Sequence, residues 1–129
     1  MKKALIFLGS SIIFIAIVVG LWVWSSTTES KNAAETPINT DIVLFYGQDC
    51  PHCKDVEKFI AENGIAEKVK FDSLEVWHNK ANSNILLKKA QECNIAEDKT
   101  GVPFLYSKGE CHVGTPDIEK FFKQAAGIQ

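Results

Sequence analysis

Residues 42–53 read IVLFYGQDCPHC, and they determine how the rest of the chain is interpreted. The first five, Ile42 to Tyr46, form a short run of apolar, β-branched and aromatic side chains, which is typical of a strand buried on both faces. Gly47 ends this run. Cys50 and Cys53 follow at once, so we expect both to lie where a strand gives way to a helix.

The residues after the two cysteines predict that helix. Val56, Phe59 and Ile60 recur at helical spacing, and Asn63-Gly64 is a typical C-terminal stop. Unpaired backbone N–H groups and the helix dipole stabilise negative charge at the start of a helix. A cysteine placed there is therefore expected to react as a thiolate.

Four residues of the motif are assigned catalytic roles on this basis. Cys50 is the expected nucleophile, and His52 is expected to add to the stabilisation of its thiolate. Pro51 suits the first helical turn because it has no N–H to lose, and it helps to hold the two sulfurs at bonding distance. Cys53, about one turn further on, is expected to resolve the mixed disulfide. Stabilising a thiolate makes the disulfide a stronger oxidant, so the histidine favours oxidation or isomerisation over reduction.

The remaining patterns predict an alternating α/β fold. A second strand is expected around Val69, Phe71, Leu74 and Val76, and a second helix carries Ile85, Leu86, Ala90 and Cys93 on one face. Residues 102–106 and 110–113 flank the turn-forming stretch 107–109 and predict an antiparallel hairpin. A closing helix follows, with Pro116 in its first turn and Ile118, Phe121 and Phe122 on its apolar face.

The segment Thr100-Gly101-Val102-Pro103 opens this hairpin. A proline entering a strand must lie where no ladder donor is needed, and a cis bond before it would turn the backbone of Val102 toward a ligand or peptide. From its position about 50 residues after the cysteines, this segment is expected to face them from a neighbouring loop at the carboxyl end of the sheet.

A strand, Cys-x-x-Cys at a helix start, and Gly-Val-Pro before a hairpin together resemble the thioredoxin superfamily. The resemblance covers roughly residues 41–122, and the compact topology is closest to glutaredoxins. The Pro-His pair inside the motif is similar to that of DsbA-type periplasmic oxidases. The resemblance implies a mixed sheet, βαβ followed by ββα, flanked by helices. It also implies that Cys50 attacks, that Cys53 resolves, and that Val102 and Pro103 bind substrate, with the residue before the cis-proline pairing with substrate backbone.

The N-terminal part of the chain predicts a membrane anchor. Lys2 and Lys3 precede an apolar run over residues 4–24, roughly the length that crosses a bilayer as a helix. The two lysines should stay cytoplasmic by the positive-inside rule, which places the rest of the chain outside the cytoplasm. A cleaved signal peptide is the alternative. Residues 1–24 are thus interpreted as a signal-anchor, 25–40 as a flexible linker, and 41–129 as a single extracytoplasmic domain at the cell membrane.

The other two cysteines, Cys93 and Cys111, are candidates for a structural disulfide, because spare cysteines of an exported domain usually pair. The alternative is a second redox pair that relays electrons to or from Cys50 and Cys53. A zinc site is a further alternative, with Cys93, Cys111 or His112 completing the ligands, but their separation lacks paired-knuckle spacing. No metal and no cofactor beyond the redox-active cysteine pair are expected.

Charge excludes other classes of function. The chain has 14 lysines and no arginine against 16 acidic residues, a net charge of −2, so it offers no basic surface for nucleic acid. The expected partners are exported protein substrates and a membrane or soluble redox partner. The sequence therefore predicts a membrane-tethered thiol-disulfide oxidoreductase. An extracytoplasmic reductase fed by a membrane electron donor, and a non-catalytic binding or zinc module on the same fold, are the alternatives.

Overall fold

The computed structural model describes residues 36–129. The predicted anchor over residues 4–24, and most of the linker, lie outside the described residues. Within residues 36–129, no helix is both long and apolar enough to cross a membrane.

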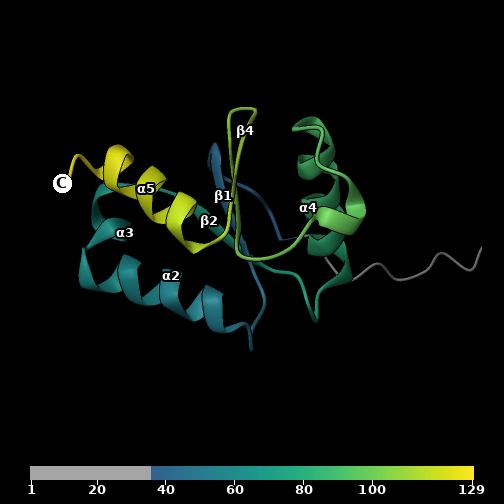
Figure 1. The fold of residues 1–129 in the computed structure, drawn as a ribbon, viewed down its shortest axis with the longest axis horizontal. Helices are drawn as coiled ribbons and strands as arrows, with labels where there is room; N and C mark the ends of the chain where they lie inside the picture. Colours follow the sequence, from purple (N-terminus) through teal and green to yellow (C-terminus); the bar gives the residue numbers. More distant parts are fainter. Residues whose placement is uncertain (1–35) are drawn as a thin grey trace, which may run out of the picture. The chain divides into compact units, whose positions relative to one another are not determined.

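Four strands form one mixed sheet at the centre of the domain (Figure 1). They are β1 (Ile42–Tyr46), β2 (Asp72–Glu75), β3 (Phe104–Ser107) and β4 (Glu110–Val113), arranged in the order β2-β1-β3-β4. β1 runs parallel to β2 and antiparallel to β3, and β3 pairs antiparallel with β4. The predicted βαβ unit followed by a hairpin is confirmed.

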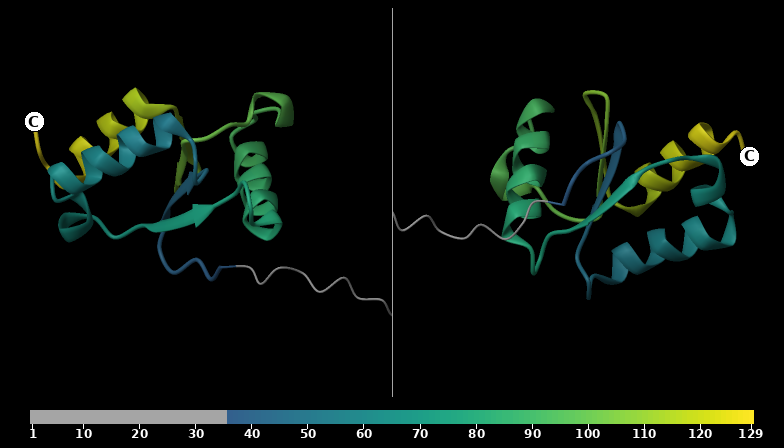
Figure 2. Two further views of the ribbon diagram at one scale, coloured as in Figure 1. Left: turned by 90° about the horizontal axis from the view of Figure 1, so that it is seen from below. Right: turned by 180° about the vertical axis from the view of Figure 1, so that it is seen from behind.

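Helices cover both faces of this sheet (Figure 2). α2 (Pro51–Glu62), the short α3 (Ile65–Lys68) and α5 (Thr115–Ala126) lie on one side. α4 (Lys80–Glu92), followed by the 3-10 turn η1 (Glu97–Lys99), lies on the other. The expectation of a sheet flanked by helices is confirmed.

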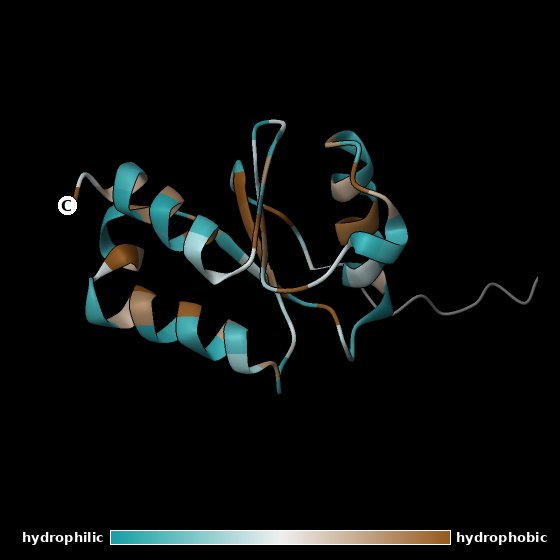
Figure 3. Ribbon diagram, in the orientation of Figure 1, coloured by the Kyte–Doolittle hydropathy of each residue, from teal (hydrophilic) through white to brown (hydrophobic). Residues whose placement is uncertain are grey.

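The strands separate two apolar clusters. Val43 and Phe45 of β1 pack toward α4, whereas Leu44 packs toward α2 and α5. The ring of Phe45 meets that of Phe104 edge-on across β1 and β3, with 6.1 Å between centroids. Figure 3 shows hydrophobic residues concentrated in the central strands and hydrophilic residues prominent on the helices. Alternate side chains of β1 are therefore buried on opposite faces, as the unbroken apolar run indicates.

Two boundaries differ from the sequence-based expectation. Val69 and Phe71 precede β2 instead of belonging to it, and α3 was not predicted. Gly64 does end α2, but its left-handed conformation (φ 60°) also begins one further turn, which buries Ile65 against α2 and α5. A single turn of four residues leaves no periodicity in the sequence, since its stability comes from packing.

The last part of the predicted linker is held to the domain by Asp72. Its Oδ2 accepts the backbone N–H of Asn39 at 2.7 Å and that of Thr40 at 2.8 Å, and also the Thr40 hydroxyl at 3.0 Å. Partial burial alone would raise the pKa of this carboxyl, but the donors from Asn39 and Thr40 outweigh it and lower the pKa. The chain before β1 is thereby fastened to the start of β2.

We expect Asp72→Asn to lower the free energy of unfolding by about 1 kcal/mol near pH 7, a modest loss because the site is partly exposed. Because the pKa of Asp72 is lower in the folded state than in the unfolded state, where it is about 3.9, the carboxylate stabilises the fold fully at pH values well above 3.9. This contribution is lost as the pH falls through the folded-state pKa. Urea unfolding should therefore show the difference from wild type shrinking below about pH 4. Asp41→Asn is the control, because Asp41 is 73% exposed and meets only Lys108 Nζ at 3.4 Å. A difference that persists in acid would contradict this account.

Candidate active site

Cys50 lies at the junction that the sequence indicates, as the N-cap of α2. Its backbone N–H donates to Gly47 O at 3.1 Å, which folds the loop after β1 back on itself. Its Sγ accepts the backbone N–H of Cys53 at 3.3 Å. The sulfur thus occupies the position where a capping oxygen usually satisfies the first free donors of a helix, and a thiolate there would gain a charge-assisted hydrogen bond.

Cys53 is the more buried of the two thiols, 1% exposed against 5% for Cys50. Both are free. Burial first, and then the hydrogen bond with the Cys50 side chain, raise the pKa of Cys53 to about 12. The two sulfurs therefore differ: Cys50 faces helix donors, and Cys53 keeps its proton in an apolar setting.

The loop before β3 meets the cysteines. The Val102-Pro103 peptide bond is cis, and the thiol of Cys50 lies 3.7 Å from Val102 O. Pro103 also lines the cavity behind Cys53. Cys50 and Val102, 52 positions apart in the sequence, thus meet at one end of the two central strands, β1 and β3.

The side chain of His52, which was expected to influence the Cys50 sulfur, is largely exposed and lies near Asp55. Its side chain is 77% exposed, and Nδ1 lies 3.8 Å from Asp55 Oδ2, one turn along α2. Its backbone oxygen accepts the hydroxyl of Thr115 at 3.1 Å, which joins the start of α2 to the start of α5. The sequence analysis did not identify Thr115. Thr115 follows the last strand by two residues, at the same end of the sheet as the cysteines, and this position could have indicated that it lies near the start of α2.

An exposed tryptophan lies beside the cysteine loop, and the sequence analysis also missed it. The Trp77 indole covers the backbone of Gly47 so closely that a Cβ at residue 47 would overlap the ring. The indole remains 53% exposed. The backbone N–H of Trp77 donates to Glu75 Oε1 at 2.8 Å, and the backbone N–H of His78 donates to Glu75 Oε2 at 2.9 Å. Partial burial would raise the pKa of Glu75, but the donors from His78 and Trp77 outweigh it and lower the pKa.

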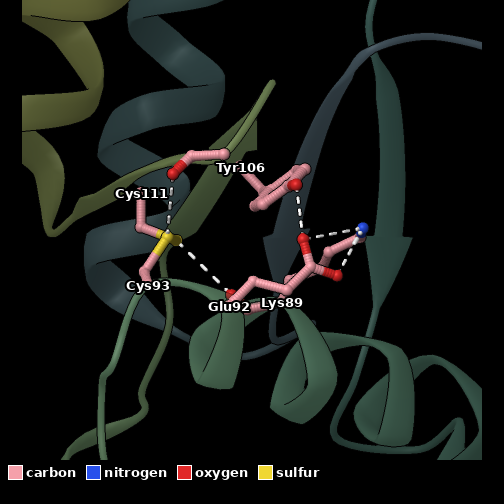
Figure 4. A network of polar contacts seen from close by, with 6 residues as sticks. Lys89, Glu92, Cys93, Tyr106 and Cys111 are labelled. Atoms are coloured by element: carbon pink, nitrogen blue, oxygen red, sulfur yellow. Dashed lines mark hydrogen bonds and ion pairs between the residues drawn. A yellow bond between two sulfur atoms is a disulfide. The ribbon is translucent and has the colours of Figure 1, made fainter.

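Cys93 and Cys111 form a disulfide with each other. Around it, Glu92 accepts the hydroxyl of Tyr106 and the ammonium of Lys89, which lies 4.2 Å from the centre of the Tyr106 ring (Figure 4). The donors from Tyr106 and then Lys89 lower the pKa of Glu92. Both sulfurs are engaged in the bridge, so neither is free to complete a zinc site with Cys50 and Cys53.

A mixed four-stranded sheet, a Cys-x-x-Cys pair at the start of a helix and a cis-proline facing it define a thioredoxin-like fold that carries a dithiol site. No family model matches the sequence, and no curated protein matches it significantly. Among solved structures, a mutant of the thioredoxin-like protein BC3987 matches with a TM-score of 0.51 and 27% identity, over 70% of this chain and 99% of that one. This match supports the fold that the resemblance implied.

Two glutaredoxins are also similar. One from Archaeoglobus fulgidus has a TM-score of 0.48 and 17% identity, over 67% of this chain and 86% of that one. A buckwheat glutaredoxin, solved as a complex with glutathione, has a TM-score of 0.45 and 17% identity, over 67% and 70% of the two chains.

Proposed function

We propose that the chain is a membrane-tethered thiol-disulfide oxidoreductase that acts on exported protein thiols through Cys50 and Cys53, as an oxidase or isomerase. The observation that carries this proposal is the position of the Cys50 sulfur. It caps α2, accepts the Cys53 N–H, and lies beside the backbone of Val102. A sulfur in this position can be stabilised as a leaving group and can meet a bound peptide at the same time.

In the oxidising direction, a substrate thiolate attacks Cys50 Sγ of the Cys50–Cys53 disulfide, and Cys53 leaves as a thiolate that takes up a proton. A second substrate thiolate then attacks the substrate sulfur of the mixed disulfide and releases Cys50. Two electrons pass from the substrate thiols to the cysteine pair, and a redox partner reoxidises it. The reverse sequence reduces a substrate disulfide.

Val102 supports the choice of a protein substrate. Its side chain packs against the apolar cluster that Val43 and Phe45 form with α4, while its carbonyl lies next to the Cys50 sulfur. An extended peptide bound to this backbone would present its own cysteine to Cys50. The exposed Trp77, which covers Gly47 at the same end of the strands, offers apolar surface for such a peptide.

The direction of reaction is tested by a redox titration of the purified full-length chain, with the thiols counted by alkylation and mass spectrometry. We expect a reversible two-electron transition confined to Cys50 and Cys53. A potential above about −200 mV would support the oxidase or isomerase, whereas one near −270 mV would support the alternative, a reductase fed by a membrane donor. A pair that forms no reversible bridge in any redox buffer would overturn the proposed activity and favour a non-catalytic binding module.

A further inference from the structure

The hydroxyl of Thr115 is directed at the start of α2 instead of at its own helix. Thr115 is the first residue of α5, and Gly114, which has no side chain, occupies the N-cap position. A threonine at the N-cap would bind free N–H groups of its own helix. The Thr115 hydroxyl donates instead to the backbone oxygen of His52 at 3.1 Å. This hydrogen bond therefore serves α2, the helix that carries the cysteines.

The backbone oxygen of His52 belongs to the same peptide group as the N–H of Cys53. That N–H is the donor that the Cys50 sulfur accepts, at 3.3 Å. A carbonyl oxygen has two lone pairs, so Thr115 can bind it in addition to the N–H four residues further along the helix. The Thr115 hydroxyl, this peptide group and the Cys50 sulfur thus form a continuous chain of two hydrogen bonds.

Hydrogen bonds in such a chain strengthen one another. A donor on the carbonyl oxygen of a peptide group draws electron density toward that oxygen, and the N–H of the same group becomes a better donor. The gain is largest where the final acceptor is charged, because hydrogen bonds to ionised groups are about twice as strong as neutral ones. Thr115 is thus placed to act on a thiolate at Cys50 without touching it.

The loop that carries the cis-proline holds Thr115 in this position. The N–H of Gly114 donates to Pro103 O at 3.0 Å, directly before Thr115 in the chain. The preceding carbonyl of that loop, Val102 O, lies 3.7 Å from the Cys50 sulfur. The loop before β3 therefore meets the sulfur directly, and the start of α5, which is bound to this loop, meets it through the first turn of α2.

We infer that Thr115 is a positioning residue for the reaction and stabilises the Cys50 thiolate through the peptide group of residues 52 and 53. The inference rests on the proposed function. In the reduced chain the Cys53 N–H faces a sulfur that can carry negative charge, whereas in the disulfide that sulfur is neutral. The Thr115 hydrogen bond therefore favours the reduced form and makes the bridge a stronger oxidant.

The test is the equilibrium between the full-length chain and a thiol redox buffer, followed by alkylation and mass spectrometry. Two buffer thiols are oxidised to one disulfide while the Cys50–Cys53 bridge is reduced to the dithiol. We expect Thr115→Val, which keeps the branched shape and lacks only the hydroxyl, to lower the equilibrium constant for this reduction about twofold to fivefold. This change corresponds to a potential lower by about 10 to 20 mV. Thr115→Ser keeps the hydroxyl and should restore the wild-type constant.

Thr40→Val is the matched control. It also removes a hydroxyl that donates to a backbone oxygen, that of Ile42 at 2.7 Å, but at the end of β1 away from the cysteines. This variant should lose stability and keep the wild-type equilibrium constant. A shift in Thr40→Val as large as that in Thr115→Val would contradict a specific role of Thr115.

A spectroscopic measurement follows the hydrogen bond itself. In a proton–nitrogen correlation spectrum of the reduced full-length chain, the amide proton of Cys53 should move upfield in Thr115→Val, because its hydrogen bond to the Cys50 sulfur is weaker. The resonance should return in Thr115→Ser. An unchanged equilibrium constant, an unchanged Cys53 resonance, or a loss that serine does not restore would overturn the role of Thr115. A wild-type chain that forms no bridge in any redox buffer would instead overturn the proposed function.

Discussion

Replacing Cys50 with serine is expected to lower the rate of thiol-disulfide exchange by at least about a thousandfold, because the reacting sulfur is lost. A serine hydroxyl can still cap α2 through its oxygen, so the fold should persist. The measurement is the oxidation or reduction of a peptide that contains a cysteine pair, followed by mass spectrometry. Unchanged thermal unfolding would show that chemistry alone was removed.

Cys53→Ser is the matched variant, and it should fail at a different step. Cys50 is retained, so its thiolate still attacks a substrate disulfide, but without Cys53 the resulting mixed disulfide is not displaced in this reducing direction and should accumulate as one substrate per chain. This adduct should survive denaturation and disappear on treatment with excess reductant. Equal activity of both serine variants and wild type, or an adduct on Cys93 or Cys111 instead of Cys50, would contradict the assigned roles.

Removal of the Cys93–Cys111 bridge is expected to have the second largest effect, on stability. The two cysteines are 18 residues apart, and a bridge closing a loop of about this length contributes roughly 3 kcal/mol. In a domain of this size, we expect the double variant Cys93→Ala/Cys111→Ala to unfold about 10 to 20 °C lower. The measurement is circular dichroism during heating. Cys50→Ala/Cys53→Ala is the control, because it removes two cysteines that are not bridged.

The position of the bridge favours a structural role over an electron relay. Cys111 pairs with Tyr106 in the β3–β4 ladder, whereas Val113 pairs with Phe104, next to the cis-proline. Cys111 thus lies two residues, about 7 Å along the strand, beyond the Val113–Phe104 pair and on the side away from Cys50 and Cys53. Cys111 also packs against the apolar cluster between the sheet and α4, on the face of the sheet opposite to α2. Loss of exchange activity in the double variant, with no loss of stability, would instead indicate a relay.

The polar network beside the bridge cannot replace it. Lys89 Nζ lies 2.9 Å from Glu92 Oε1, and Tyr106 donates to the same carboxylate, but the ion pair is partly open to solvent, with Lys89 26% and Glu92 46% exposed. Exposed ion pairs contribute at most about 1 kcal/mol. The covalent link is therefore expected to be the main connection between the end of α4 and β4.

The sequence by itself determined the elements whose patterns are strong and local. An unbroken apolar run predicts β1, because a strand covered on both faces needs apolar side chains in both directions. Helical spacing after Pro51, with Cys50 just before it, predicted the start of α2 and placed Cys50 at that start. Gly101-Val102-Pro103 indicated the loop that opens the hairpin. These features depend on neighbours within a few residues, so one sequence suffices to find them.

Only the tertiary structure decided which distant groups meet. The α3 turn exists because Ile65 is buried by other helices, and Val69 and Phe71 contribute to the core without belonging to β2. The bond between Cys93 and Cys111, the indole of Trp77 over Gly47, and the shared cavity of Cys53 and Pro103 all follow from packing. Such contacts carry no signal in local periodicity, because the fold as a whole sets the distance between residues far apart along the chain.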